Sequence, residues 1–149
     1  MEKRISKDMY LMSVALLTAK RSTCVSKQIG AVLVSEDGRV VMTGYNGVSK
    51  GKPHCNERYD PNNFDRERHH EWSLKNELHC EENILSYCAK NGIKTENTTM
   101  YITMSPCTSC ARLLIASGIK KVLYVEEYDK DKYGIMVLNT NGVRCEQWK

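Results

Sequence analysis

Two short segments carry residues whose types and spacing suit metal chemistry. The first is His79-Cys80-Glu81, and the second is the C-x-x-C pair Cys107 and Cys110, which follows a proline. One imidazole and two thiolates would give Zn²⁺ three protein ligands, and a tetrahedral zinc ion with three protein ligands keeps one position open for water. The carboxylate of Glu81 would remain free to carry protons. These residues therefore indicate a catalytic zinc site.

The combination of the two segments is more specific than either one. A C-x-x-C pair alone also occurs in redox pairs and zinc ribbons, whereas H-x-E together with P-C-x-x-C is the signature of zinc-dependent nucleobase deaminases. Metal binding lowers the pKa of water to about 7, and Glu81 would carry the proton of that water to the ring nitrogen of the base. A structural zinc site stays the alternative, although it would recruit a fourth protein ligand and has no need of Glu81.

Both segments are expected at the starts of helices. Residues 79–91 and 107–117 show helical spacing, with stop signals at Gly92 and Gly118. Helix N-termini carry unpaired N–H groups and partial positive charge, which favour the thiolate form of the two cysteines. If both helices follow loops at one end of a sheet, the segments converge although they are distant in the sequence.

The remaining periodicity predicts the sheet itself. Helical spacing is also found at residues 6–20 and, more weakly, at 129–139. β-Rich runs are found at residues 29–35, 40–44, 98–103, 121–125 and 143–146. The Asp37-Gly38 turn between the first two runs is typical of a β-hairpin. Strands that alternate with helices in this way predict one α/β domain over residues 1–149, with helices packed on the faces of a sheet.

The stretch from residue 45 to 68 is predicted to be irregular. Its first part is rich in Gly, Asn and Pro, and its polar character continues through residues 60–68. Such a long irregular stretch is uncommon in a compact domain unless it has a function or is held by something. Cys55 and His69 lie in or beside it.

Composition narrows the class of protein. The chain has 149 residues, of which 41% are hydrophobic and 27% charged, as in ordinary globular proteins. The charged N-terminus is unlike a signal peptide, and no apolar run approaches about 18 residues, so a cytoplasmic protein without a membrane partner is expected. Seven cysteines are an odd number and favour metal binding over a disulfide framework. A net charge of +4 and 7% aromatic residues argue against a nucleic-acid partner.

The chain resembles the zinc-dependent deoxycytidylate (dCMP) deaminases, especially those of phages and bacteria. The matching motifs lie at residues 21–24, 29–34, 44–47, 70–83, 105–110 and 118–124. The Glu-Trp-Ser-x-Lys-Asn-Glu block at residues 71–77 is the discriminating part, because cytidine deaminases and tRNA adenosine deaminases do not usually carry it. The resemblance implies a cytidine-deaminase-like three-layer α/β/α sandwich with a five-stranded mixed sheet, and conversion of dCMP to dUMP and ammonia, which feeds dTMP synthesis.

The resemblance also implies contacts with the nucleotide. They are Asn46 to the deoxyribose, the backbone N–H of Cys80 to the base carbonyl, the backbone C=O of Ser105 to the exocyclic amine, and Tyr128 near the nucleotide. Ser26 or Lys27 is the candidate for the phosphate. Cys80 stands where the family usually has alanine, and a role that uses its backbone leaves the chemistry intact.

Some members of this family bind a second, structural zinc. The matching positions in this chain are Cys24, Cys55, His69 and Glu77. A closed four-ligand site would supply folding energy that the composition of the irregular stretch does not. The alternative is that these are unrelated polar-loop residues, and His54 and His70 compete with His69 as candidate ligands.

Regulation and assembly are implied only by the resemblance. Family members are typically hexamers that are activated by dCTP with Mg²⁺ and inhibited by dTTP, with the loop at residues 47–51 implicated. The segment between Cys55 and His69 is shorter here than in some relatives. A phage-encoded member would work in the host cytoplasm.

Two other functions remain open on the sequence alone. The first is a deaminase that acts on a nucleic acid, which the small net charge disfavours. The second is a zinc-stabilised binding module without catalysis, which requires a fourth protein ligand beside His79, Cys107 and Cys110.

Overall fold

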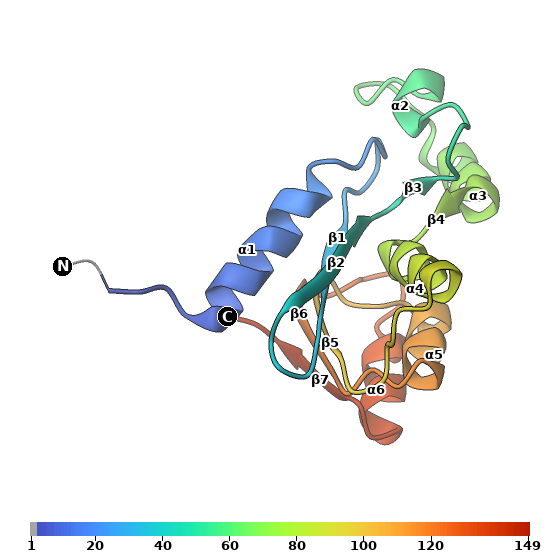
Figure 1. The fold of residues 1–149 in the computed structure, drawn as a ribbon. Helices are drawn as coiled ribbons and strands as arrows, with labels where there is room; N and C mark the ends of the chain where they lie inside the picture. The colour runs from blue at the N-terminus through green and yellow to red at the C-terminus, as the bar shows by residue number, and fades with distance from the viewer. Residues whose placement is uncertain (1–2) are drawn as a thin grey trace.

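The computed structural model describes residues 3–149 and contains a mixed five-stranded sheet between helical layers (Figure 1). The strands are β1 (Gly30–Val34), β2 (Val40–Tyr45), β5 (Thr99–Met104), β6 (Lys121–Glu126) and β7 (Arg144–Gln147), and a separate pair is β3 (Gly47–Val48) and β4 (Glu77–Leu78). The helices are α1 (Lys7–Ala19), α2 (Cys55–Arg58), α3 (Arg66–Asn76), α4 (Cys80–Asn91), α5 (Thr108–Ala116) and α6 (Tyr133–Thr140).

The sheet has the strand order β2-β1-β5-β6-β7. Strand β1 is antiparallel to both β2 and β5, whereas β5, β6 and β7 run parallel to one another. The predicted hairpin is confirmed, because β1 and β2 pair directly and Gly38 in their turn has a φ of 86°. Parallel neighbours require a crossover helix, and α5 and α6 supply the two crossovers.

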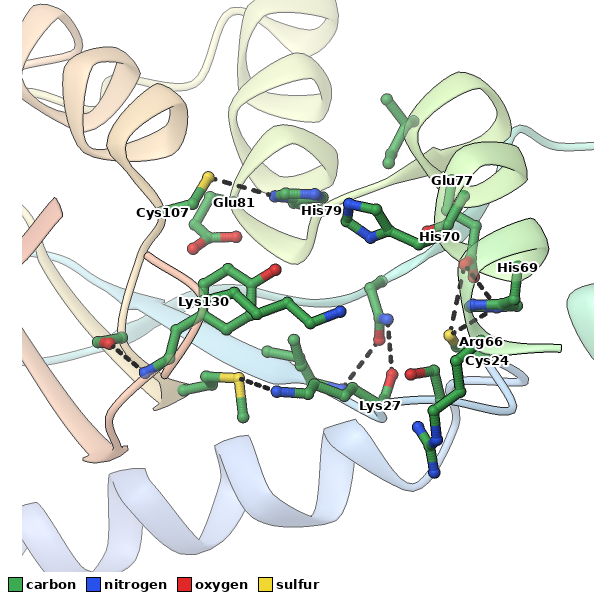
Figure 2. A pocket seen from close by; sticks show the side chains of 18 residues that line it. Cys24, Lys27, Arg66, His69, His70, Glu77, His79, Glu81, Cys107 and Lys130 are labelled. Carbon is green, nitrogen blue, oxygen red and sulfur yellow. Dashed lines mark hydrogen bonds and ion pairs between the residues drawn. The ribbon is translucent and has the colours of Figure 1, made fainter. Parts of the chain in front are cut away.

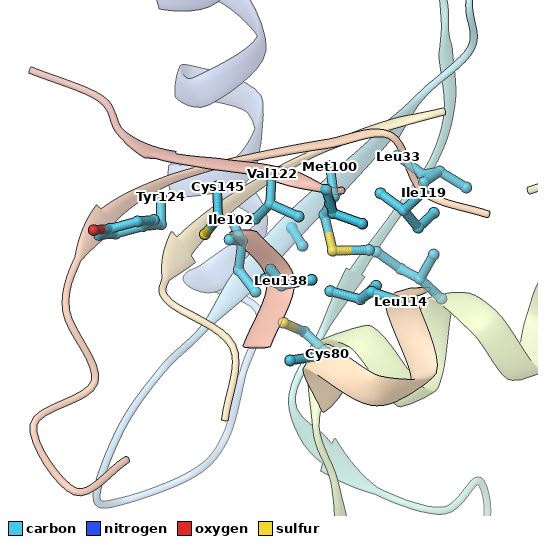
Figure 3. Close-up of a cluster of buried hydrophobic side chains, with 14 of the residues drawn as sticks. Leu33, Cys80, Met100, Ile102, Leu114, Ile119, Val122, Tyr124, Leu138 and Cys145 are labelled. Atoms are coloured by element: carbon cyan, nitrogen blue, oxygen red, sulfur yellow. The ribbon is translucent and has the colours of Figure 1, made fainter. Parts of the chain in front are cut away.

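Helices cover both faces of the sheet (Figure 1). Helix α1 packs its buried residues Leu11, Met12 and Ala15 onto one face. Helices α4, α5 and α6 cover the other face, where Ile84, Leu114 and Leu138 are fully buried against the inward side chains of the central strands. Figure 3 shows the side chains of this second core. The layers form the predicted three-layer α/β/α sandwich, and the second core fixes the N-termini of α4 and α5.

The prediction of a continuous irregular stretch was wrong. Residues 55–58 form helix α2, and residues 66–76 form helix α3, whose N-cap Asp65 accepts a hydrogen bond from the backbone N–H of Arg68 at 3.0 Å. Helix α3 was not predicted, because its only buried residue is His69 and it therefore lacks an apolar stripe. Within residues 3–149, every helix is too short or too polar to cross a bilayer.

Candidate active site and metal centres

His79, Cys107 and Cys110 come together at the N-termini of α4 and α5. His79 is the N-cap of α4, and Cys107 is the N-cap of α5. The Nδ1 atom of His79 lies 3.6 Å from the Sγ of Cys107 and 3.4 Å from the Sγ of Cys110. Zn–S bonds of about 2.3 Å and Zn–N bonds of about 2.0 Å at tetrahedral angles give ligand separations of about 3.4–3.8 Å. The three atoms therefore fit one zinc ion.

Local hydrogen bonds explain why the chain turns into α4 at this point. The backbone N–H of His79 donates to Oε1 of Glu82 at 2.8 Å, which forms a capping box with the side chain of His79. Glu82 therefore caps the helix, a role that was not predicted from the sequence. The H-x-x-E spacing is the signal that could have revealed it.

A clamp from outside the motif holds the start of α5. Asp131 accepts two hydrogen bonds from Thr108, from the backbone N–H at 2.7 Å and from Oγ1 at 2.8 Å. These bonds hold the pKa of Asp131 below its ordinary value. A Cβ on Gly134 would lie 2.1 Å from the backbone oxygen of Pro106, so this position requires glycine. The role of Asp131 is not predictable from the sequence, because only the fold brings it to Thr108.

Glu81 lies on the inner wall of the pocket beside this group (Figure 2). It is 4% exposed, and burial raises the pKa of its carboxyl above the ordinary value. The thiol of Cys80 donates to Oε2 of Glu81 at 3.3 Å and is otherwise part of the hydrophobic core. A carboxyl group with a raised pKa is suited to exchange protons near neutral pH.

Hydrogen bonds also set the protonation of the three ligands. The bond with Cys110 lowers the pKa of Cys107 to about 4, and the same bond raises that of Cys110 well above its ordinary value. Hydrogen bonding with Cys107 raises the pKa of His79 to about 9. Because zinc ligands must be deprotonated, zinc binding would release the protons held by His79 and Cys110.

A second group of ligands consists of Cys24, Cys55, His69 and Glu77. The Nε2 atom of His69 lies 3.7 Å from the Sγ of Cys24 and 3.3 Å from the Sγ of Cys55. Oε1 of Glu77 lies 3.3 Å from the Sγ of Cys24 and 3.6 Å from Nε2 of His69. These separations are also those of ligands around one tetrahedral zinc ion.

The surroundings of the four-residue group favour a bound cation. Oε2 of Glu77 is a buried oxygen that the described residues leave without a hydrogen-bond partner, and such a group is costly unless a cation compensates it. Burial raises the pKa of Cys24 to about 12 and lowers the pKa of His69. The rings of Tyr59 and Phe64 lie 5.1 and 5.4 Å from the ring of His69 and exclude water from that side.

The remaining predicted residues line the same pocket or its wall. Asn46 is 8% exposed, and its side chain accepts from the backbone N–H of Ile29 at 2.9 Å and donates to the backbone oxygen of Lys27 at 2.8 Å. The Oγ of Ser105 accepts from the backbone N–H of Tyr128 at 2.8 Å. Cys80 does not line the pocket, although its neighbour Glu81 does. The other predicted nucleotide-binding residues all line it: Ser26, Lys27, Asn46, Ser105 and Tyr128.

The fold and the site define a class of metal-binding enzyme in which a His/Cys/Cys group and a glutamate at two helix N-termini face one pocket. The model of the cytidine and deoxycytidylate deaminase zinc-binding region matches residues 5–126. The chain therefore belongs to the cytidine and deoxycytidylate deaminase family.

Individual relatives agree with this assignment. The chain is 36% identical over 155 aligned residues to the deoxycytidylate deaminase of Enterobacteria phage T2, covering 83% of this chain and 82% of the relative. The deoxycytidylate deaminase of Enterobacteria phage T4 is also 36% identical, with 83% and 80% covered. The crystal structure of the dCMP deaminase of cyanophage S-TIM5 with dCMP and dUMP superposes with a TM-score of 0.80, at 28% identity and coverage of 99% and 100%.

Proposed function

We propose that the protein hydrolyses dCMP to dUMP and ammonia, with residues 1–149 acting as one deaminase domain that supplies dUMP for dTMP synthesis. The observation that carries the proposal is the meeting of Glu81 with His79, Cys107 and Cys110 at one pocket. The similarity to a cyanophage enzyme solved with dCMP and dUMP supports the choice of substrate.

In the proposed mechanism, three residues bind the metal and a fourth transfers protons. His79, Cys107 and Cys110 would hold Zn²⁺, which when bound lowers the pKa of water and supplies a nucleophile near neutral pH. Glu81 takes a proton from the attacking water and gives it to the ring nitrogen of cytosine as oxygen adds to the adjacent amidine carbon. Glu81 then takes the proton of the new hydroxyl group and passes it to the exocyclic nitrogen, so that the C–N bond breaks, the hydroxyl oxygen becomes the carbonyl oxygen of dUMP and ammonia leaves.

The contacts that orient the nucleotide are proposed from the family resemblance. Asn46 meets the deoxyribose, the backbone N–H of Cys80 meets the base carbonyl, and the backbone C=O of Ser105 meets the amine. Tyr128 borders the nucleotide. The hydrogen bonds of Asn46 to the segment before β1 support this role, because they hold its side chain in one orientation at the pocket wall.

We propose a structural Zn²⁺ at the four-residue group of Cys24, Cys55, His69 and Glu77. The ligand separations and the unsatisfied oxygen of Glu77 support it. A zinc ion with four protein ligands has no open position for water. Its role is therefore to order the segment that contains α2 and α3.

Regulation by dCTP with Mg²⁺ as activator and by dTTP as inhibitor is proposed for a second region. An open groove beside β3 is lined by Arg21, Lys50 and Lys52, and clustered cations suit a triphosphate. A homohexamer in the cytoplasm, of the host if the gene is phage-borne, is proposed from the resemblance. Light scattering with and without dCTP would test the assembly.

The proposed activity is tested with zinc-loaded protein and a panel of deoxycytidine, dCMP, dCTP and CMP, each with and without dCTP and dTTP as effectors. We expect dUMP and ammonia in equal amounts from dCMP, and loss of both with Glu81→Ala. Absence of turnover by the zinc-loaded protein contradicts the proposal. Preferential deamination of single-stranded DNA or RNA would instead favour a nucleic-acid deaminase.

A further inference from the structure

The first turn of α5 is capped by two different groups. Cys107 is the N-cap residue, and its Sγ accepts from the backbone N–H of Cys110 at 3.5 Å. Asp131, from the segment after β6, accepts from the backbone N–H of Thr108 at 2.7 Å. Sulfur is a weak acceptor, and the Sγ of Cys107 also faces His79 in the three-residue metal group (Figure 2). The strong cap of this helix is therefore Asp131.

Both oxygens of the Asp131 carboxylate take part in this contact. Oδ2 accepts from the backbone N–H of Thr108, and Oδ1 accepts from its Oγ1 at 2.8 Å. Hydrogen bonds from Thr108, and after them those from the backbone N–H groups of Tyr133 and Gly134, lower the pKa of Asp131. One carboxylate therefore joins the start of α5 to the start of α6.

The segment that carries Asp131 is itself fixed against the metal-binding segment. The backbone N–H of Ser105 donates to the backbone oxygen of Glu126 at 2.8 Å, and that of Tyr128 donates to the Oγ of Ser105 at 2.8 Å. At the other end, a Cβ on the buried Gly134 would lie only 2.9 Å from the backbone carbonyl carbon of Cys107. Contacts on both sides of Asp131 therefore fix where its carboxylate meets α5.

The position of the first turn of α5 decides the spacing of the metal ligands. Cys107 and Cys110 both lie in this turn, and their Sγ atoms are 3.6 and 3.4 Å from Nδ1 of His79. Helix ends fray, and fraying here would move one sulfur relative to the other. Helix α4 is capped from within by Glu82, whereas α5 depends on a carboxylate from a distant part of the chain.

We propose that Asp131 is a positioning residue for the metal ion of the three-residue group. It fixes the first turn of α5 through Thr108 and so sets the spacing of Cys107 and Cys110. This assignment rests on the zinc site of the proposed function, although not on the choice of substrate. Groups that hold metal ligands in place are typically worth about 10–100-fold in metal affinity.

The test measures the Kd for zinc in each group by competition with a chelator of known zinc affinity. The zinc that Cys110→Ala loses belongs to the three-residue group, and the zinc that Cys55→Ala loses belongs to the four-residue group. In Asp131→Ala, we expect the first Kd to rise at least about tenfold and the second to stay unchanged. Asp131→Asn keeps an oxygen that can accept from the backbone N–H of Thr108, so its Kd should lie between those of the wild type and Asp131→Ala.

Three further variants make the test specific. Asp129→Ala removes a carboxylate of the same segment that pairs with Lys27 and not with Thr108, so both zinc Kd values should stay unchanged. Thr108→Ser keeps both donors and should match the wild type. Thr108→Val removes the hydroxyl donor and should raise the Kd of the three-residue group, but it should add nothing in the Asp131→Ala background, where the acceptor is already gone.

Several results would overturn the proposal. They are an unchanged Kd of the three-residue group in Asp131→Ala, an equal rise in both groups, an equal effect of Asp129→Ala, or a wild type from which Cys110→Ala removes no zinc. Circular dichroism verifies that each variant is folded, and Asp131→Asn and Thr108→Val carry the test if Asp131→Ala is not.

The outcome is independent of catalysis, because zinc binding needs no turnover. A protein that shows the expected zinc affinities but deaminates no cytosine compound would refute the proposed function and leave this proposal standing.

Discussion

The two metal-binding groups meet in one short segment, residues 77–79, which supplies Glu77 to the four-residue group and His79 to the three-residue group. They differ in how far their ligands are exposed to a pocket. The three-residue group has His79 and Cys107 half-buried and Glu81 beside it, facing a pocket. The four-residue group has every ligand buried, with aromatic rings around His69. We call the group of His79, Cys107 and Cys110 the open group and the group of Cys24, Cys55, His69 and Glu77 the closed group. An open group with a neighbouring acid is suited to catalysis, whereas a closed group is suited to stabilising the fold.

Short connections make the two groups interdependent. Glu77 begins β4, Leu78 pairs with Gly47 of β3, and His79 follows as the cap of α4. Movement of Glu77 would therefore reach His79 through a single residue. Ordering of α2 and α3 by the closed group is expected to help place the open group.

The largest effect is expected when the acid of the open group is removed. Glu81→Gln keeps the size of the side chain and abolishes proton transfer, so kcat should fall by about 10²–10⁴. Zinc content should be unchanged, because Glu81 is not needed as a ligand. Steady-state kinetics with dCMP and metal analysis by mass spectrometry check both points, and a variant that keeps its kcat contradicts the role of Glu81.

Substitution of one buried cysteine in each group distinguishes the catalytic role of the open group from the stabilising role of the closed group. Cys110 and Cys55 are each 1% exposed, so alanine creates similar cavities. Cys110→Ala should abolish turnover, whereas Cys55→Ala should lower the free energy of unfolding by about 3–5 kcal/mol, because it leaves Glu77 buried and poorly compensated. Urea unfolding and dCMP turnover of the two zinc-loaded variants are the measurements. Equal losses of stability would mean that the closed group has no special structural role.

A smaller effect is expected at the clamp that holds the open group. Asp131→Asn should cost about 1–2 kcal/mol of stability at neutral pH, because hydrogen bonds from Thr108 favour the charged carboxylate. A depressed pKa stabilises the fold above the unfolded value, 3.8, and that stabilisation is lost as pH falls through the lower folded pKa. Urea unfolding across the acid range should show the two proteins converge below pH 3.8, and a difference that persists there argues against this cause.

The smallest effect is expected beside His79. Cys80 is buried in the second core, and the proposed contact with the base uses only its backbone N–H. Cys80→Ala should therefore leave kcat/KM for dCMP within about twofold and cost about 1 kcal/mol of stability. A loss of zinc from this variant would show that the thiol of Cys80 is a ligand after all.

Strong local patterns explain what the sequence predicted. β-Rich runs and turn residues predicted the five strands of the sheet, and glycine stop signals predicted the ends of α4 and α5, where Gly92 and Gly118 have φ values of 65° and 77°. The His79, Cys107 and Cys110 group was predictable because its residue types and spacing are unusual. These features depend on near neighbours in the chain.

The features that the sequence did not predict depend on tertiary contacts. Helix α3 has a polar surface and buries only His69, so its periodicity carries no apolar signal. The clamp of Asp131 on Thr108 joins residues that only the packing of α5 against the following segment brings together.

A crystal structure of the zinc-loaded protein with dUMP, recorded with anomalous scattering at the zinc edge, tests the comparison most directly. We predict zinc in both groups, with only three protein ligands at His79, Cys107 and Cys110 and the pyrimidine ring beside Glu81. Zinc with a fourth protein ligand in that group, or dUMP bound away from it, would contradict the assignment of chemistry to the open group.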